Sequence, residues 1–386
     1  MKEKINSLVF AILLIAGLGF PTSVEGNISI ELSILHSFLL IFLLFILLIN
    51  NGIIIANLFI VLLINLLLLT FTLLQVPLNN LERISLGAYL PYLIFSILLL
   101  INLKKIHLKS HTKIMFLIVN IVNILLGLTI INDVQYIEKF LLNNYSLGYD
   151  ELLTNMLIQN KPVTFFGAHS IASFMNFILF YLNFTSFKRE KNKISLLLAL
   201  GNLTIIFFLN SVAAYIFFAM GVIILLIFFL GKYRLSNYIL VFFLLGISIF
   251  LYGEVKENLA KVFASENNGF LGRYSSAGIL QNNLDYISSN LLPIGLWISD
   301  NLYFTDSGYI LNYLKGSLFL VLSVYTGLFI FLKKNLLSRK IFIQLFLLLM
   351  IFEIAYPFIS YIRLLYLLPF FIVYLNYLSR EEIKNI

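Results

Sequence analysis

Long apolar stretches alternate with shorter polar connections along almost the whole chain. A helix needs roughly 20 apolar residues to cross about 30 Å of hydrocarbon, and fewer where its ends lie in the interface. The pattern predicts an all-α polytopic membrane protein with about twelve transmembrane helices. These lie near residues 7–20, 34–49, 53–74, 87–103, 114–131, 167–185, 194–210, 212–230, 238–252, 308–332, 341–358 and 364–378.

Two polar connections are much longer than the others. Residues 132–166 contain EKFLLNN and DELLTNMLIQN, whose apolar and polar positions alternate at helical spacing and predict short helices lying on the membrane surface. Residues 254–307 form the second long segment, set between two strongly hydrophobic stretches. Neither reads as a soluble domain, and the chain has no internal repeat, so residues 1–386 are predicted to form a single membrane domain.

The charge distribution predicts the orientation in the membrane. The net charge is +8, but the basic residues gather in runs between apolar stretches. These runs lie at residues 2–4, 104–113, 188–193, 231–234, 333–340 and 380–384. Lys and Arg in alternate short loops mark the cytoplasmic side. We therefore expect both termini in the cytoplasm, both long segments outside, and no nucleic-acid partner.

The first apolar stretch has two interpretations. MKEK before an apolar core resembles the start of a signal peptide, but no A-x-A-like cleavage site follows in GFPTSVEG. We expect a retained helix. Cleavage would leave the remaining topology unchanged.

The composition excludes several kinds of chemistry. With 61% hydrophobic and 11% charged residues the chain lies outside the range of soluble domains. It has no cysteine, hence no disulfide, thiolate metal site or cysteine nucleophile. Its four histidines and its carboxylates form no cluster at ligand spacing, so we expect no metal and no cofactor.

Some basic residues depart from the cytoplasmic bias and fall on the outer side. They are Arg83, Lys139, Lys161, Lys256, Lys261, Arg273, Lys315 and Arg363. Arg363 lies in the short hairpin YPFISYIRLL, and Lys315 lies about two turns into an apolar stretch. Individually, Arg363 can snorkel to the interface and Lys315 can pair with an outer carboxylate. Together they predict an outer anion site in which Arg273, Arg363 and Lys161 hold a lipid diphosphate.

His169 is the candidate general base. It stands in KPVTFFGAHS, between the first long segment and an apolar stretch, where an imidazole can titrate near neutral pH. The alternative is a hydrogen-bonded interfacial histidine. His36 also opens an apolar stretch but has no comparable polar neighbourhood in the sequence.

Further candidates lie at the end of the second long segment. Asp306 either caps the following helix or orients a base, and Tyr309 follows it in TDSGYI. Trp297 either stacks on a sugar or anchors the segment at the interface. Glu353, inside an apolar stretch, is neutral or pairs with Lys315 or Arg363.

The order of these features along the chain and the side of the membrane on which they fall resemble those of the Wzy-type polysaccharide polymerases of O-antigen and capsule assembly. More distantly, they resemble those of the O-antigen ligases. KPVTFFGAHS resembles a pattern in which a basic residue and a proline precede a Gly-x-His or Asn turn into a helix. GRYSS, LLPIGLW and DSGYILNYLKG resemble the arginine, Pro-x-Gly and Asp-x-x-Tyr stretch before the next span. Lys161 departs from the pattern, where arginine is commoner, and so loses the bidentate fork.

The resemblance implies a GT-C-like, metal-independent glycosyltransferase of the bacterial cytoplasmic (inner) membrane, with its active site on the outer face. It would transfer a glycan from undecaprenyl diphosphate to the non-reducing end of another lipid-linked repeat unit, beside a chain-length regulator and a flippase. Arg273, Arg363 and Lys161 would bind the diphosphate, and His169 or Asp306 would activate the acceptor hydroxyl. The remaining substrate contacts would come from Tyr274, Tyr309, Lys315, Trp297 and Arg83.

Two other functions remain open. A ligase would transfer the glycan to a different acceptor lipid. A flippase would carry the lipid-linked repeat unit across the membrane, and such transporters concentrate ionisable residues at mid-membrane and use broken helices.

Overall fold

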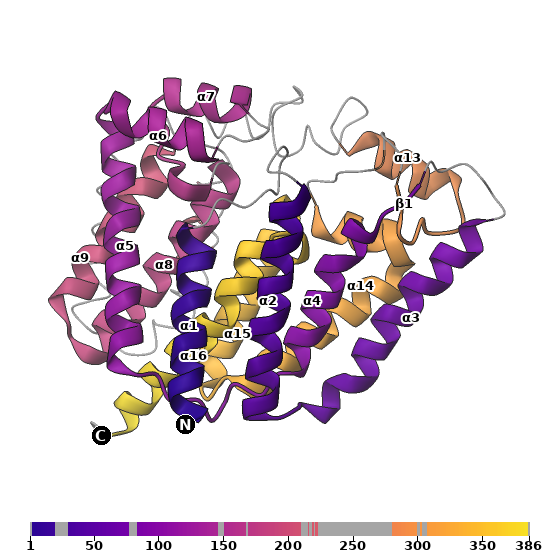
Figure 1. Cartoon of the computed structure of the whole chain (residues 1–386), viewed down its shortest axis with the longest axis horizontal. Coiled ribbons are helices and arrows are strands. Elements are labelled where there is room, and N and C mark those ends of the chain that lie inside the picture. Colours follow the sequence, from indigo (N-terminus) through magenta and orange to yellow (C-terminus); the bar gives the residue numbers. More distant parts are fainter. Residues whose placement is uncertain are drawn as a thin grey trace.

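A computed structural model gives the arrangement of the chain (Figure 1). It describes residues 2–19, 30–76, 83–145, 150–166, 169–209, 215, 218–219, 221–222, 280–298, 302 and 307–384. The predicted spans at 212–230 and 238–252 lie largely or wholly outside these residues. So do the candidates Lys256, Lys261, Arg273, Tyr274 and Asp306.

The described residues form an all-α bundle of long helices. These are α1 (Lys2–Gly19), α2 (Ile30–Asn51), α3 (Leu58–Gln75), α4 (Leu86–Leu100), α5 (Ser110–Ile131), α8 (His169–Glu190), α9 (Lys193–Phe208), α14 (Gly308–Asn335), α15 (Arg339–Ala355) and α16 (Ile362–Lys384). Each coincides with a predicted span. Within the described residues, 5 helical stretches can cross a membrane by length and composition, at residues 55–75, 110–131, 169–190, 308–335 and 362–380, and shorter apolar helices accompany them.

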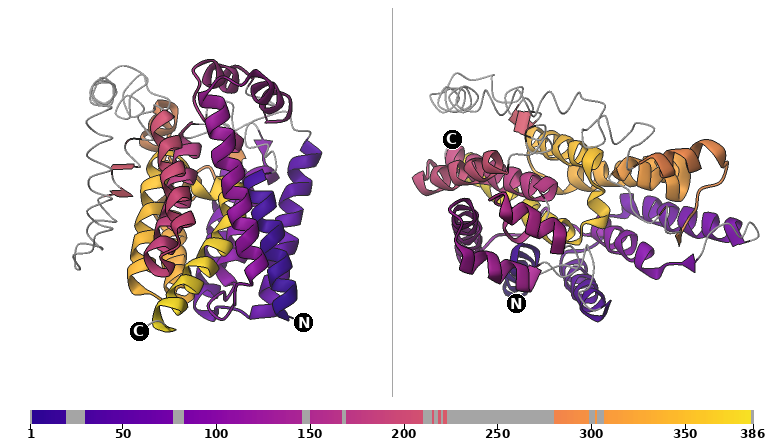
Figure 2. Two further views of the ribbon diagram at one scale, coloured as in Figure 1. Left: turned by 90° about the vertical axis from the view of Figure 1, so that its left-hand side faces the viewer. Right: turned by 90° about the horizontal axis from the view of Figure 1, so that it is seen from above.

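Short elements cover one end of the bundle. In the first long segment lie α6 (Gln135–Tyr145) and α7 (Asp150–Ile158), where the sequence predicts surface helices, and η3 (Thr164–Phe166) follows. The same end carries α13 (Gln281–Ser289), β1 (Arg83–Ile84) and β2 (Trp297–Ile298), the two strands pairing antiparallel. Figures 1 and 2 place these elements opposite the two termini.

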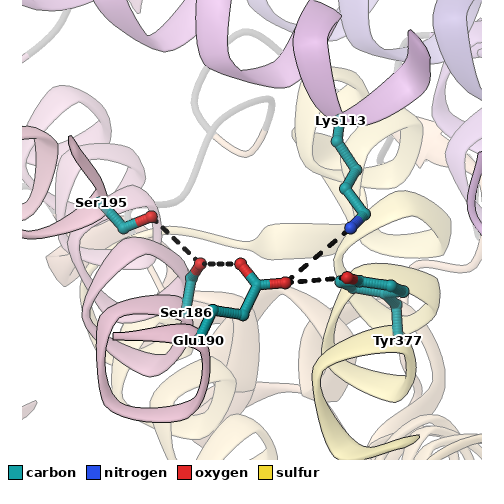
Figure 3. Close-up of polar contacts among 5 residues, drawn as sticks. All are labelled: Lys113, Ser186, Glu190, Ser195 and Tyr377. Carbon is teal, nitrogen blue, oxygen red and sulfur yellow. Dashed lines mark hydrogen bonds and ion pairs between the residues drawn. The ribbon is translucent and has the colours of Figure 1, made fainter. Parts of the chain in front are cut away.

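The end that carries the termini is also the basic end. The side chain of Glu190, at the end of α8, accepts from Tyr377 of α16 (2.8 Å) and Ser186 (2.9 Å) and lies 3.8 Å from the ammonium of Lys113 at the start of α5 (Figure 3). Ser186 also bonds Ser195 of α9 at 3.1 Å. Three helices, α5, α8 and α16, therefore meet at one carboxylate, and Ser186 links α9 to it, among the basic runs from which the sequence predicts the cytoplasmic side.

The helices are sorted by polarity between the inside and the outside of the bundle. Among the stretches that can span a membrane, those of α3 and α5 are the most hydrophobic and the most exposed, whereas those of α8 and α16 are less hydrophobic and almost wholly buried. This sorting suits a bilayer, because lipid-facing positions must be apolar while polar groups find partners only inside the bundle.

Buried polar side chains join neighbouring helices. Asn123 of α5 donates to Asn176 of α8 (2.9 Å), and Asn202 of α9 donates to Asn120 of α5 (3.0 Å). Tyr181 of α8 donates its hydroxyl to Gln344 of α15 (2.9 Å). Interhelical hydrogen bonds of this kind stabilise helix packing in a membrane, where no hydrophobic force acts between helices.

Candidate functional site

Arg363 lies in the first turn of α16, at the end of that helix farthest from the C-terminus. Its side chain is only 3% exposed, so it does not snorkel to the surface. The guanidinium carbon lies 5.7 Å from the centroid of the Phe166 ring in η3. The ring of Tyr366, one turn along α16, lies 4.9 Å from that of His36 on α2, and the Tyr366 hydroxyl donates to the His36 carbonyl. We call His36, Phe166, Arg363 and Tyr366 the arginine cluster.

The segment before η3 is conformationally strained. Asn160, two residues after the end of α7, is in the left-handed region (φ 51°), and the N–H of Lys161 donates back to Met156 (2.9 Å), which is the Schellman pattern of helix termination. Thr164 also has a positive φ of 52° and is buried. A β-branched residue there is a true outlier, and such strain clusters at functional sites.

This strained turn lies between two predicted site residues. Lys161 precedes Phe166 by five positions and His169 follows it by three, at the first position of α8, and both side chains are half-buried. Arg363 packs on Phe166 from a part of the chain some 200 positions away. The fold therefore brings Lys161, His169 and Arg363 to one end of the bundle, around η3.

A second group of polar residues crosses the bundle from α4 to α15. The Tyr92 hydroxyl donates to Asn312 Oδ1 (2.8 Å), Asn312 Nδ2 donates to the Tyr325 hydroxyl (3.2 Å), and that hydroxyl donates to Glu353 Oε2 (2.6 Å). The backbone N–H of Phe358 donates to Glu353 Oε1 (2.8 Å). We call Tyr92, Asn312, Tyr325 and Glu353 the polar chain.

Glu353 is fully buried and bonds neither cation proposed for it. Within the described residues, its carboxylate is satisfied by Tyr325 and Phe358, and no ion pair links it to Lys315 or Arg363. A Cβ on Gly308 would lie 1.4 Å from Oε2, so only glycine allows α14 to begin against this carboxylate. Glu353 thereby ties the start of α14 to η5 (Phe358–Ser360), the turn that leads into Arg363.

Helix α14 is broken where it carries Lys315. Gly316 (φ −153°, ψ 23°) and Ser317 (φ 62°, ψ −169°) leave the helical conformation. The carbonyls just before the break, those of Leu314 and Lys315, accept from the N–H groups of Ile294 (2.9 Å) and Gly295 (3.1 Å). Backbone groups released by a break inside a membrane need such partners.

Residues 292–298, which we call the hook, supply these N–H groups and are fixed to α3. Thr72 accepts from the Leu296 N–H on its hydroxyl (2.9 Å) and from Trp297 Nε1 on its carbonyl (2.9 Å). Gln75 donates to the carbonyls of Leu292 (3.1 Å) and Pro293 (2.9 Å). The indole N–H of Trp297 thus anchors the hook to a neighbouring helix.

The other sequence candidates lie around the hook and α14. Arg83 belongs to β1 and pairs with Ile298 of β2, which fixes its backbone. Tyr309 donates its hydroxyl to the Met350 carbonyl on α15 (2.9 Å). Lys315 is 6% exposed and makes no hydrogen bond or ion pair with any described residue, so the predicted pairing with a carboxylate is not observed.

The packing of His36 beside Tyr366 and Arg363 was not predicted from the sequence. Its ring packs on Tyr366 and lies within the electrostatic field of Arg363. These residues are more than 300 positions apart, so spacing alone could not find the contact. The available signal was the burial of a histidine and an arginine at the same end of two apolar helices.

No protein-family model, curated protein or solved structure matches the chain. The functional assignment therefore depends on the residues of the chain itself.

Proposed function

We propose that the protein is a Wzy-type polysaccharide polymerase of the bacterial cytoplasmic membrane, with about twelve spans in a GT-C-like arrangement. The observation that supports this most directly is the packing of Arg363 on Phe166, which gathers Lys161, His169 and Arg363 at one end of the bundle. By the positive-inside rule, the basic end with both termini is cytoplasmic, and this gathering faces outside.

The proposed reaction joins two lipid-linked oligosaccharides. The acceptor hydroxyl oxygen forms a bond to the anomeric carbon of the donor glycan, and the bond from that carbon to the diphosphate oxygen breaks. His169, or Asp306, takes the hydroxyl proton. Undecaprenyl diphosphate leaves with its developing negative charge held by Arg363 and Arg273, assisted by Lys161.

The buried surroundings of Arg363 favour this role. A guanidinium in a low-dielectric setting binds phosphate oxygens more strongly than one in water, and its planar fork allows two parallel hydrogen bonds. Phe166 presents a ring face on one side, which supports a cation without neutralising it.

Deleting the gene in a polysaccharide-producing host tests the proposal. If the protein is a polymerase, the deletion strain should carry surface glycan with a single repeat unit. Polymer that accumulates on undecaprenyl diphosphate without reaching its acceptor lipid would point to the ligase, and complete loss of surface glycan would point to the flippase.

Variants test the named residues. Arg363→Ala and Arg273→Ala should abolish chain extension while the protein stays in the membrane, and His169→Gln should slow extension strongly. Lys139→Ala on the exposed face of α6 is the matched control and should extend chains normally. Near-normal chain length in both arginine variants would refute the diphosphate site.

One observation favours a second candidate. The break in α14 beside buried Lys315 is a feature that transporters use at their substrate sites. A lipid-linked repeat-unit flippase therefore remains the alternative, and the deletion experiment distinguishes the two.

A further inference from the structure

The break in α14 is a built feature of the bundle. Gly316 is required there, because a Cβ would lie 2.5 Å from that of Leu320. Gly295 of the hook has φ +62°, and a Cβ on it would lie 2.4 Å from the Thr72 nitrogen. Two closely fitted glycines and a dedicated hook thus maintain a helix interruption seven residues, about 10 Å, below the start of α14.

Lys315 lies at this interruption, and no described residue supplies a counter-charge to it. Its side chain is more than nine-tenths buried and bonds no described residue. The carbonyl of Leu314 and that of Lys315 itself, which would otherwise attract the ammonium, are occupied by the hook. Burying an isolated ammonium costs several kcal/mol, and intramembrane cations are kept where they serve a function.

The second half of α14 begins directly after Lys315. Its N-terminus carries the positive end of a helix dipole and backbone N–H groups released by the break, and Ser317 caps only the Phe319 N–H, at 3.4 Å. Lys315 immediately precedes this helix end in the chain, so both contribute positive potential to the same stretch of α14. Asn312, one turn earlier, is already engaged in the polar chain and supplies no counter-charge.

We propose that Lys315 and the start of the second half of α14 form an anion-binding site inside the bundle, separate from the arginine cluster. The chemistry suits an oxyanion, either a phosphate or a carboxylate. A phosphate would come from a lipid diphosphate, whereas a carboxylate would come from an acidic sugar in the glycan. The site goes beyond the proposed transfer reaction and does not depend on it.

The test uses purified full-length protein in detergent. Arg363→Met forms the background, so that the arginine cluster does not contribute. Binding is measured calorimetrically with inorganic pyrophosphate, with D-glucuronate, and with D-glucose as a neutral probe. We expect one of the two anions to bind, and its identity distinguishes the two sources, while D-glucose does not bind.

Adding Lys315→Met should weaken that binding at least about tenfold, which corresponds to about 1.4 kcal/mol. Adding Lys139→Met, at an exposed lysine, should leave it unchanged. If Lys315→Met fails to fold, Lys315→Gln decides by the same measurement.

Unchanged affinity in the Lys315 variant, or no anion binding in the Arg363→Met background, would overturn the site. Chain extension in cells is a separate measurement. If no anion site is found while the cellular tests support a polymerase, the anion-site proposal fails. If the anion site is found while the cellular tests contradict a polymerase, the proposed function fails.

Discussion

Substitution of Gly295 by alanine tests whether the hook is a structural requirement of the bundle. Two costs arise at this position. The left-handed φ of +62° costs an L-residue about 1–2 kcal/mol. The new methyl would also lie 2.4 Å from the nitrogen and 2.7 Å from the Cα of Thr72, and because these are backbone atoms they cannot rotate away.

Overpacking of this kind costs about 1–3 kcal/mol. We therefore expect Gly295→Ala to lower the free energy of unfolding by about 2–5 kcal/mol, the sum of the two costs. If the hook moves away instead, its N–H bonds to Leu314 and Lys315 are lost, at about 0.5–1.5 kcal/mol each. Together with the conformational cost, which remains, this route also amounts to about 2–5 kcal/mol.

Gly52 supplies the matched control. It also has a positive φ, +85°, but nothing lies within 4 Å of a Cβ built there. Gly52→Ala should therefore cost only the conformational term, about 1–2 kcal/mol. The difference between the two variants isolates the packing of the hook against α3.

Equilibrium unfolding of both variants in mixed micelles measures this difference. The reasoning requires Gly295→Ala to be the less stable by at least about 1 kcal/mol. Equal losses in the two variants would refute the tight contact with Thr72. They would also remove the argument that the break in α14 is built.

Three further predictions concern polar contacts. Tyr325→Phe removes a hydrogen bond to a buried carboxylate and should lower the free energy of unfolding by about 1.5–3 kcal/mol. Tyr309→Phe removes a hydrogen bond to a neutral carbonyl and should lower it by only about 0.5–1.5 kcal/mol. In the network of Figure 3, Lys113→Ala should cost less than about 1 kcal/mol because the pair is partly exposed, but Glu190→Ala should cost more because two hydroxyl donors lose their acceptor. On α6, burial and, to a smaller extent, the neighbouring Asp133 raise the pKa of Glu138. The free energy of unfolding should therefore fall as the pH rises through the folded-state pKa of Glu138. Glu138→Gln should remove that dependence in unfolding midpoints measured between about pH 4 and 7.

The sequence predicted the helices well because their signal is local. The ten long helices of the described residues lie at predicted spans, and short helices occupy residues 135–145 and 150–158 where polar and apolar residues alternate. The break at Gly316 was not predicted, because a glycine in an apolar stretch is compatible with a continuous helix. The break is stabilised by the hook, which donates to Leu314 and Lys315 of α14. The hook in turn is held by residues of α3 that lie more than 200 positions away in the sequence.

The candidate site was predicted only in part, for the same reason. Lys161 and His169 are close in sequence, so their common location follows from one short segment. The contact of Arg363 with Phe166 and the position of His36 beside Tyr366 depend on helix packing, which one sequence does not specify. Glu353 depends on packing in the same way: the sequence left open a neutral form or an ion pair with Lys315 or Arg363, and the carboxylate is held by Tyr325 and Phe358.

Hydrogen bonds to a neighbouring helix distinguish three buried polar residues of this bundle from Lys315. Asn123, Asn202 and Glu353 each bond a neighbouring helix, which accounts for their presence in an apolar setting. Lys315 bonds no described residue, although its charged side chain is more costly to bury than an amide. The burial of the Lys315 ammonium beside the break in α14 is explained if a bound anionic ligand supplies the counter-charge. The predicted order of effects follows: loss of Glu353 should impair folding, and loss of Lys315 should impair binding.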